Sequence, residues 1–154
     1  MTTLQGQATI SIASQATVVY DLIADVTTMS QWSPECVRCE WLDEPGHVGS
    51  RFRGHNRRGP LRWKTIAQVV AAERGRVFAF TTMHRDREST RWRYELRATP
   101  NGTEVVESFE AIHVPQPIRI IERVFMPNRQ RELIAGMHVT LERIRAAAEP
   151  VPRH

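Results

Sequence analysis

Apolar and polar residues alternate at the start of the chain and then change to a helical repeat. Residues 6–14, GQATISIAS, alternate strictly, which predicts a strand. In residues 14–26, SQATVVYDLIADV, apolar residues recur every four positions, which predicts a helix with Ser14 as a candidate N-cap. The positions that carry this repeat are Val18, Leu22 and Val26.

A second short helix is predicted in TTMSQW, residues 27–32, with Thr27 or Thr28 as its N-cap. Pro34 follows closely and prevents its continuation. This connector is short and otherwise largely polar, yet it contains the large side chain of Trp32.

Extended segments fill the middle of the chain and are separated by short turns rich in Gly, Pro, Asn and Asp. Because parallel strands need crossovers of a dozen or more residues, turns this short predict antiparallel hairpins in a meander. The expected strands are residues 36–43, 50–57, 61–73, 76–84, 90–99 and 103–113.

Alternation also assigns the faces of these strands. In TRWRYELRA the arginines share one face, while Trp92, Tyr94 and Leu96 share the other. The last strand allows two choices, with the odd positions from 105 to 111 inward or the even ones. We choose the odd set, which includes Glu107, because the even set exposes Phe109.

Helical patterns occupy the C-terminal part of the chain. PQPIRIIERVF, residues 115–125, is one piece, and Pro127 separates it from a long amphipathic helix over residues 128–148. The apolar stripe of the long helix is expected to consist of Leu133, Met137, Leu141 and Ile144.

Length and composition indicate one globular domain over residues 1–154, with an ordered core of about 7–148. The chain has 154 residues, of which 41% are hydrophobic and 25% charged, values typical of a folded domain. It contains no run of about 18 apolar residues, so we expect no membrane span. The N-terminus MTTLQGQAT lacks the features of a secretion signal, and we expect a cytoplasmic protein, monomeric or homodimeric.

The net charge of +4 comes mainly from arginines. Acidic residues are interspersed along most of the chain, so no nucleic-acid partner is expected. Residues 51–64 form an Arg-rich hairpin that could meet an anionic surface, an acidic carrier protein or nucleic acid; a solvated hairpin is the preferred interpretation.

Cys36 and Cys39 form a lone C-x-x-C sequence. In a regular strand, residues three apart lie about 10 Å apart and point to opposite faces. A disulfide needs a much shorter separation, and no second cysteine pair completes a zinc site. We therefore predict two free thiols and no bound metal.

The order of elements resembles a known superfamily. A strand, two short helices, six antiparallel strands and a long C-terminal helix are similar to the helix-grip fold of the START and birch-pollen-allergen (SRPBCC) proteins, nearest the polyketide cyclase/dehydrase-like branch. The resemblance covers residues 7–148. It is carried by ATISIASQATVVYDLIADVTTMSQWSP, GSRFRGHNRRGPLRWKTIAQV, RWRYELRATPNGTEVVESFE and VTLERIRAAAE.

This resemblance implies an α+β helix-grip fold, in which a curved antiparallel sheet of about seven strands wraps around the long C-terminal helix. It also implies that a cavity lies between the sheet and the helix, and that Trp32 points into this interior. A hydrophobic or aromatic small molecule, polyketide- or lipid-like, is the implied ligand, held mainly by aromatic side chains with a few polar groups. The alternative is that the same residues only form a core. The candidates are Trp32, Phe52, Asn56, Trp63, Thr65, Phe80, Thr82, His84, Trp92, Tyr94, Glu107, Phe109, Phe125 and Met137.

Glu107 is the candidate with the most distinctive chemistry. A carboxyl group among aromatic side chains either finds a cation or a hydrogen-bond donor, or acquires a raised pKa suited to acid–base work. We expect a partner in His84 or in an arginine such as Arg129; Glu107, His84 and Tyr94 are the weak catalytic candidates. No metal, nucleotide or hydrolase motif is present, so no cofactor is expected.

Three functions remain open at this stage. The first is ligand binding, the second is a cofactor-independent polyketide cyclase or dehydratase, and the third is a partner-binding module that uses the outer face of the sheet.

Overall fold

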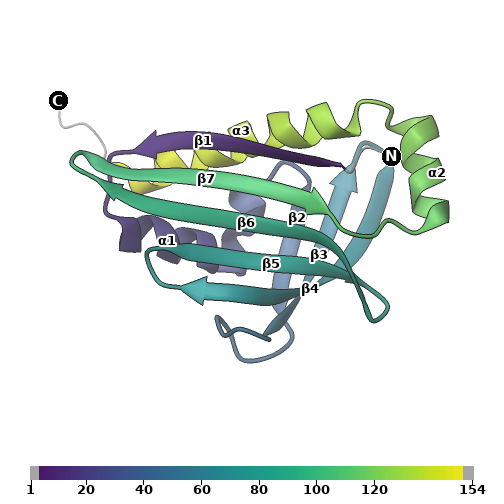
Figure 1. Cartoon of the computed structure of the whole chain (residues 1–154), viewed down its shortest axis with the longest axis horizontal. Coiled ribbons are helices and arrows are strands. Elements are labelled where there is room, and N and C mark those ends of the chain that lie inside the picture. Colours follow the sequence, from purple (N-terminus) through teal and green to yellow (C-terminus); the bar gives the residue numbers. More distant parts are fainter. Residues whose placement is uncertain (1–3, 151–154) are drawn as a thin grey trace.

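A computed structural model describes residues 4–150, apart from the side chain of Phe125. Its elements follow the predicted order (Figure 1). They are β1 (Gln5–Ile12), α1 (Ala16–Ala24), the 3-10 helix η1 (Val26–Gln31), β2 (Cys36–Trp41), β3 (Arg51–Arg58), β4 (Leu61–Glu73), β5 (Val77–His84), β6 (Arg87–Thr99), β7 (Gly102–Ala111), α2 (Gln116–Phe125) and α3 (Arg129–Ala148).

The strands form one antiparallel sheet of seven, in the order β1-β7-β6-β5-β4-β3-β2. Every pair except β1–β7 is a hairpin between consecutive strands, as the short turns predict. In Figure 1 the long helix α3 runs along the sheet beside β1, and α1 lies against the sheet near β5 and β6. The helix-grip architecture predicted from the sequence is confirmed.

The core lies between the inner face of the sheet, α1 and α3. Met137, Leu141 and Ile144 are at most 2% exposed, which confirms the predicted stripe of α3 except at its start, where Leu133 is half-buried. Burying side chains of this size contributes roughly 1.5–3 kcal/mol each. The stripe is therefore the main attachment of α3 to the sheet.

The first helix presents a different face from the one expected. Val18 is 45% exposed, and the buried residues of α1 are Val19, Tyr20 and Ile23. The ring of Tyr20 meets Phe78 edge to face at 6.2 Å between centroids, so the sheet selects the aromatic side of the helix. The periodicity predicted the helix correctly and its buried face in part: Val26 is fully buried and Leu22 half-buried, but Val18 is exposed.

Both predicted N-caps are also wrong. The N-cap position of α1 is Gln15, which makes no side-chain cap bond, and the carbonyl of Ser14 instead accepts a hydrogen bond from Thr103 Oγ1 at 2.7 Å. The side chain that caps η1 is Asp25, whose Oδ1 accepts from the backbone N–H of Thr27 at 3.1 Å.

The face of the last strand is as predicted. Val105, Glu107, Phe109 and Ala111 of β7 are all buried, whereas Glu110 is exposed. Trp32 is 5% exposed, as its predicted interior position requires, and its carbonyl accepts a hydrogen bond from Arg143 of α3.

The two cysteines lie on the same side of β2, against the prediction of opposite faces. A register shift between Cys36 and Arg38 inserts an extra residue into the pairing with β3. Both side chains therefore turn inward, and their sulfur atoms lie 3.4 Å apart, in hydrogen-bond contact but without a disulfide bond. The thiols are free as predicted, but for a different reason.

Thiol titration of the denatured, unreduced protein is expected to count two thiols. In the folded protein we expect slow reaction of both, because the side chains are only 8% and 6% exposed. Titration with a chromogenic disulfide before and after denaturation measures both quantities. A count of zero after denaturation contradicts the dithiol state.

Candidate ligand-binding site

The most unusual polar group in the interior is the carboxyl of Glu107, which β7 places on the inner face of the sheet. Its side chain is 3% exposed. The hydroxyl of Tyr94, directly opposite on β6, donates a hydrogen bond to Glu107 Oε2 at 2.8 Å. Glu107 Oε1 is buried and has no hydrogen-bond partner. Such an unpaired buried oxygen costs about 1–3 kcal/mol.

The surroundings keep this carboxyl protonated. Burial raises the pKa of Glu107 to about 8, against the smaller opposing effect of the hydrogen bond from Tyr94. Burial also raises the pKa of Tyr94 well above its usual range, and the charge and the hydrogen bond of Glu107 raise it further. At neutral pH both groups are thus predominantly neutral.

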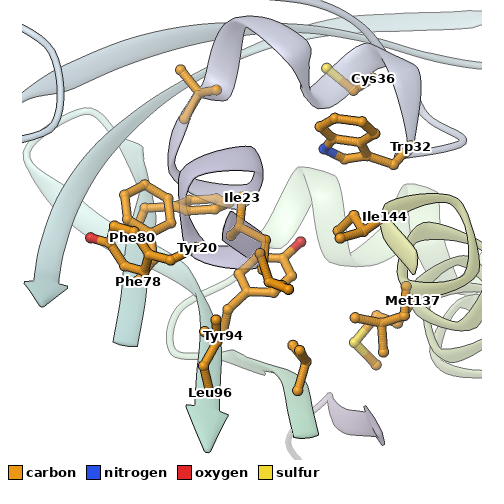
Figure 2. Close-up of a cluster of buried hydrophobic side chains, with 14 of the residues drawn as sticks. Tyr20, Ile23, Trp32, Cys36, Phe78, Phe80, Tyr94, Leu96, Met137 and Ile144 are labelled. Atoms are coloured by element: carbon orange, nitrogen blue, oxygen red, sulfur yellow. The ribbon is translucent and has the colours of Figure 1, made fainter. Parts of the chain in front are cut away.

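Aromatic side chains surround the pair on the inner face. Trp92 and Phe109, adjacent across β6 and β7, have ring centroids 5.2 Å apart. On the other side, Phe52 and Phe80 meet edge to face at 5.1 Å. Figure 2 shows Tyr94 reaching from β6 into the interior, among side chains from α1, Trp32 and Met137 and Ile144 of α3.

Two candidate polar residues bond to each other instead of standing alone. Asn56 of β3 donates through Nδ2 to Thr65 Oγ1 of β4 at 3.3 Å, and both residues are half-buried. Thr82 bonds to the backbone of Thr90, accepting from its N–H at 3.1 Å. Thr82 therefore contributes to the β5–β6 pairing more than to a site.

Trp63 lies at the less buried end of the inner face, near the start of α3. The guanidinium of Arg129 stacks over its ring at 5.9 Å from the centroid. The same guanidinium forms a bidentate pair with Glu35, including an Nη2 to Oε1 bond of 2.8 Å. Next to it Arg58 binds Glu132, so the β3–β4 hairpin is fastened to α3.

The expected partners of Glu107 were wrong. His84 is exposed because it is the last residue of β5, where the strand leaves the covered part of the inner face for the turn into β6. Arg129 is held by Glu35 and Trp63, as described above. The structure joins Glu107 to Tyr94 and not to His84, which leaves His84 outside the site.

Two hollows of the surface border the sheet, and neither encloses this pair. A hollow of about 800 Å³ is bordered mainly by outward-facing residues of β1 and β4 to β7, among them Gln7 and Arg93. Of the candidates whose side chains are described, Trp92 and Phe109 border it. A second hollow of about 420 Å³ lies at the turn around Gly102, far along the sheet. The cavity predicted between Trp63, Phe80, Trp92 and Tyr94 is not delimited by either hollow and stays a prediction.

Sequence reasoning missed one neighbour of the pair. A charge on Cys36 would raise the pKa of Tyr94, which places this thiol close to the phenol. Cys39 donates to Cys36 and so lowers the pKa of the Cys36 thiol, while its own pKa rises. The C-x-x-C sequence was a signal, but its face depended on a bulge. Phe125 is a further candidate, and its side chain lies outside the described part of the structure.

Comparison with known proteins gives one family and several similar folds. The family model described as "Polyketide cyclase / dehydrase and lipid transport" matches residues 3–149. No curated protein matches the sequence.

Three solved structures illustrate the structural likeness. A polyketide-cyclase-like protein from Corynebacterium glutamicum has 29% identity and a TM-score of 0.66, with 95% of this chain and 91% of that chain covered. The Zhui aromatase/cyclase from Streptomyces sp. R1128 has 14% identity and a TM-score of 0.74, with coverages of 96% and 94%. Major latex-like protein 151 from Panax ginseng has 14% identity and a TM-score of 0.69, with coverages of 96% and 99%. The last two show similarity of fold.

Proposed function

Because the chain belongs to the family of polyketide cyclases, dehydrases and lipid-transport proteins, we propose that it binds a hydrophobic, carbonyl-bearing small molecule between the sheet and α3. The observation that carries the proposal is the unpaired Glu107 Oε1 on a mainly apolar and aromatic inner face. A ligand group that hydrogen-bonds to this oxygen removes the cost of leaving it unpaired.

The protonation state defines the chemistry that is recognised. The hydroxyl of Tyr94 already donates a hydrogen bond to Glu107 Oε2. We therefore infer that the proton of the neutral carboxyl lies on Oε1. That O–H group is a hydrogen-bond donor, and its natural partner is a carbonyl oxygen of the ligand. The rings of Trp92 and Phe109 provide a flat apolar surface beside it.

Flavone and flavan serve as the two probes: they share the same three-ring skeleton, and flavone differs by its carbonyl and by a C2–C3 double bond, whose effect on shape does not depend on pH. Wild-type protein should bind flavone about tenfold more tightly than flavan below about pH 8, and this preference should disappear above that pH as Glu107 ionises. Quenching of tryptophan fluorescence measures both affinities. Native mass spectrometry of the purified protein provides an independent search for a co-purifying ligand.

Variants of one residue separate the hydrogen bond from simple apolar binding. Glu107→Gln keeps a donor at this position and should retain the flavone preference at all pH values. Glu107→Val should lose the preference for flavone but should still bind flavan. Glu110→Gln, on the exposed face of the same strand, serves as the control. If the wild type binds neither probe, or binds both equally at every pH, the proposed recognition is wrong.

A second candidate function uses the same carboxyl as a general acid in a cyclase or dehydratase. A pKa of about 8 leaves the proton on Glu107 at neutral pH, ready for transfer to a carbonyl or leaving hydroxyl oxygen. Loss of water from a β-hydroxy ketone, followed by mass spectrometry, tests this activity. Equal rates in the wild type and Glu107→Gln would exclude Glu107 as the acid.

A further inference from the structure

The short helix α2 presents an apolar face that the fold leaves largely uncovered. Figure 1 shows α2 at one end of the molecule, beyond the ends of the strands. Among residues 4–150 no helix is long and apolar enough to cross a membrane. Its exposed side chains, between 39% and 62% accessible, are Ile118, Ile120, Ile121 and Val124.

Positive charge gathers at the same end. The β3–β4 hairpin is fastened to the start of α3 by Arg58 and Glu132, with Nε to Oε2 at 2.7 Å. The start of β6 is tied to the segment before α2 by hydrogen bonds from the N–H groups of Ile112 and His113 to the carbonyl of Ser89. The two hairpin tips therefore lie on the side of the molecule that carries α2. Their exposed cations, with that of α2, are Arg57, Arg62, Lys64, Arg85, Arg87 and Arg123.

The ion pairs of this end do not neutralise these cations. Glu132 is bound to Arg58, Glu35 to Arg129 and Glu88 to Arg91. Asp86, in the turn between β5 and β6, and Glu110, at the end of β7, are exposed acids there, and Glu122 of α2 is half-buried; the exposed cations outnumber them. Exposed Leu61 at the tip of the β3–β4 hairpin adds another apolar group beside the arginines.

We propose that this end of the protein, made of the apolar face of α2 and the two basic hairpin tips, docks on an anionic phospholipid surface. A helix with branched aliphatic side chains on one face and arginines on the other is suited to lie in the interface of a bilayer. The cations on the hairpin tips complement the phosphate groups of anionic lipids, each adding to the attraction within a Debye length of the surface. The proposal goes beyond ligand binding and does not require it.

Docking at this end has a consequence for the ligand site. The inner-face residues nearest α2 and the start of α3, such as Trp63 and Asn56, are half-buried, whereas Tyr94 and Glu107 are buried deeper. A protein docked through α2 thus presents the less closed end of its interior to the bilayer, where hydrophobic molecules dissolve.

Flotation with phospholipid vesicles tests the proposal. Wild-type protein should float with vesicles of phosphatidylcholine and phosphatidylglycerol, should not float with phosphatidylcholine alone, and should be released by high salt. Ile120→Ser combined with Val124→Ser should weaken binding about tenfold. The matched control is Val18→Ser with Val48→Ser, which removes valines that are comparably exposed, at 45% and 65%, but lie outside this end.

A second pair of variants separates local charge from net charge. Arg57→Gln with Arg62→Gln should weaken vesicle binding about tenfold, while Arg76→Gln with Arg97→Gln, which changes the net charge equally at the opposite ends of the strands, should not. These residues are exposed, so folding should be unaffected, and circular dichroism checks this.

The outcomes are decisive in both directions. No flotation of the wild type, or equal loss in the test and control pairs, overturns the proposal. Light scattering could also show a dimer that becomes a monomer when Ile120 and Val124 are replaced. That result would assign this face to contact with a second copy of the chain and would overturn the docking proposal. The flavone titration is done without vesicles, so its failure and a failure of docking are distinguishable.

Discussion

Replacing Glu107 with Gln is expected to stabilise the protein, and the gain should grow as the pH rises. The pKa of Glu107 is about 8 in the folded protein, against an ordinary value of 4.5. Between these two values the folded protein holds a proton that the unfolded chain has released, so the free energy of unfolding falls as the pH rises. Gln stays neutral throughout and can still accept the hydrogen bond from Tyr94.

The size of this effect follows from linkage. One unit of pKa difference corresponds to about 1.4 kcal/mol, so the difference in unfolding free energy between the variant and the wild type should be roughly 3 kcal/mol at pH 7 and level off at roughly 5 kcal/mol above pH 8. Below about pH 4.5 the two proteins should be equally stable with respect to this group. Taking the difference between the two proteins removes the contributions of the other carboxyl groups.

Urea unfolding across this pH range measures the difference directly. Glu110→Gln, a neighbour on the exposed face of β7, is the control and should change little at any pH. If the difference in unfolding free energy between Glu107→Gln and the wild type does not depend on pH, the pKa of Glu107 is not raised by folding. A Gln variant that is less stable than the wild type throughout would show that the carboxyl contributes something the amide cannot replace.

Replacing Gly102 with Ala should cost about 3 kcal/mol or more of unfolding free energy. Gly102 starts β7 with a φ of 151°, and a Cβ added there lies 2.1 Å from the carbonyl oxygen of Ile12. The backbone has little room to move, because Thr103 is paired with Ile12 and its hydroxyl binds the carbonyl of Ser14 at 2.7 Å. The new methyl group must therefore push β1 and β7 apart.

A second glycine separates this overlap from backbone strain alone. Gly59 has a φ of 57° in the β3–β4 turn, and a Cβ added there meets nothing within 4 Å. Gly59→Ala should cost only about 1 kcal/mol, from the unfavourable left-handed conformation. Urea unfolding of both variants gives the comparison. Equal losses would contradict the close approach of β1 to Gly102, and with it the register that places Ala8 opposite Glu107.

The order and type of the elements were determined by the sequence alone. Period-two alternation, interrupted by short turns, allows only an antiparallel meander, since these turns cannot support crossovers. The long helix is specified by the four- and three-residue spacing of Met137, Leu141 and Ile144, and Pro127 sets its beginning. The inner face of β7 also follows from sequence, because the opposite choice would expose Phe109.

Features that depend on a partner strand or helix were decided only by the tertiary structure. The inward direction of Cys36 and Cys39 results from a bulge against β3, and the exposure of His84 follows from its place at the end of β5, beyond the covered part of the inner face. The buried face of α1 is selected by Phe78, which no local repeat encodes.

The site depends on both levels. Sequence placed Glu107 on the inner face, but its partner was set by the pairing of β6 with β7, which brings Tyr94 opposite it. An alternation pattern specifies the direction in which a side chain points, because that depends on its own strand alone. Which group it meets depends on the register between strands, a non-local property, and so the chemistry of the carboxyl emerged only when the sheet was assembled.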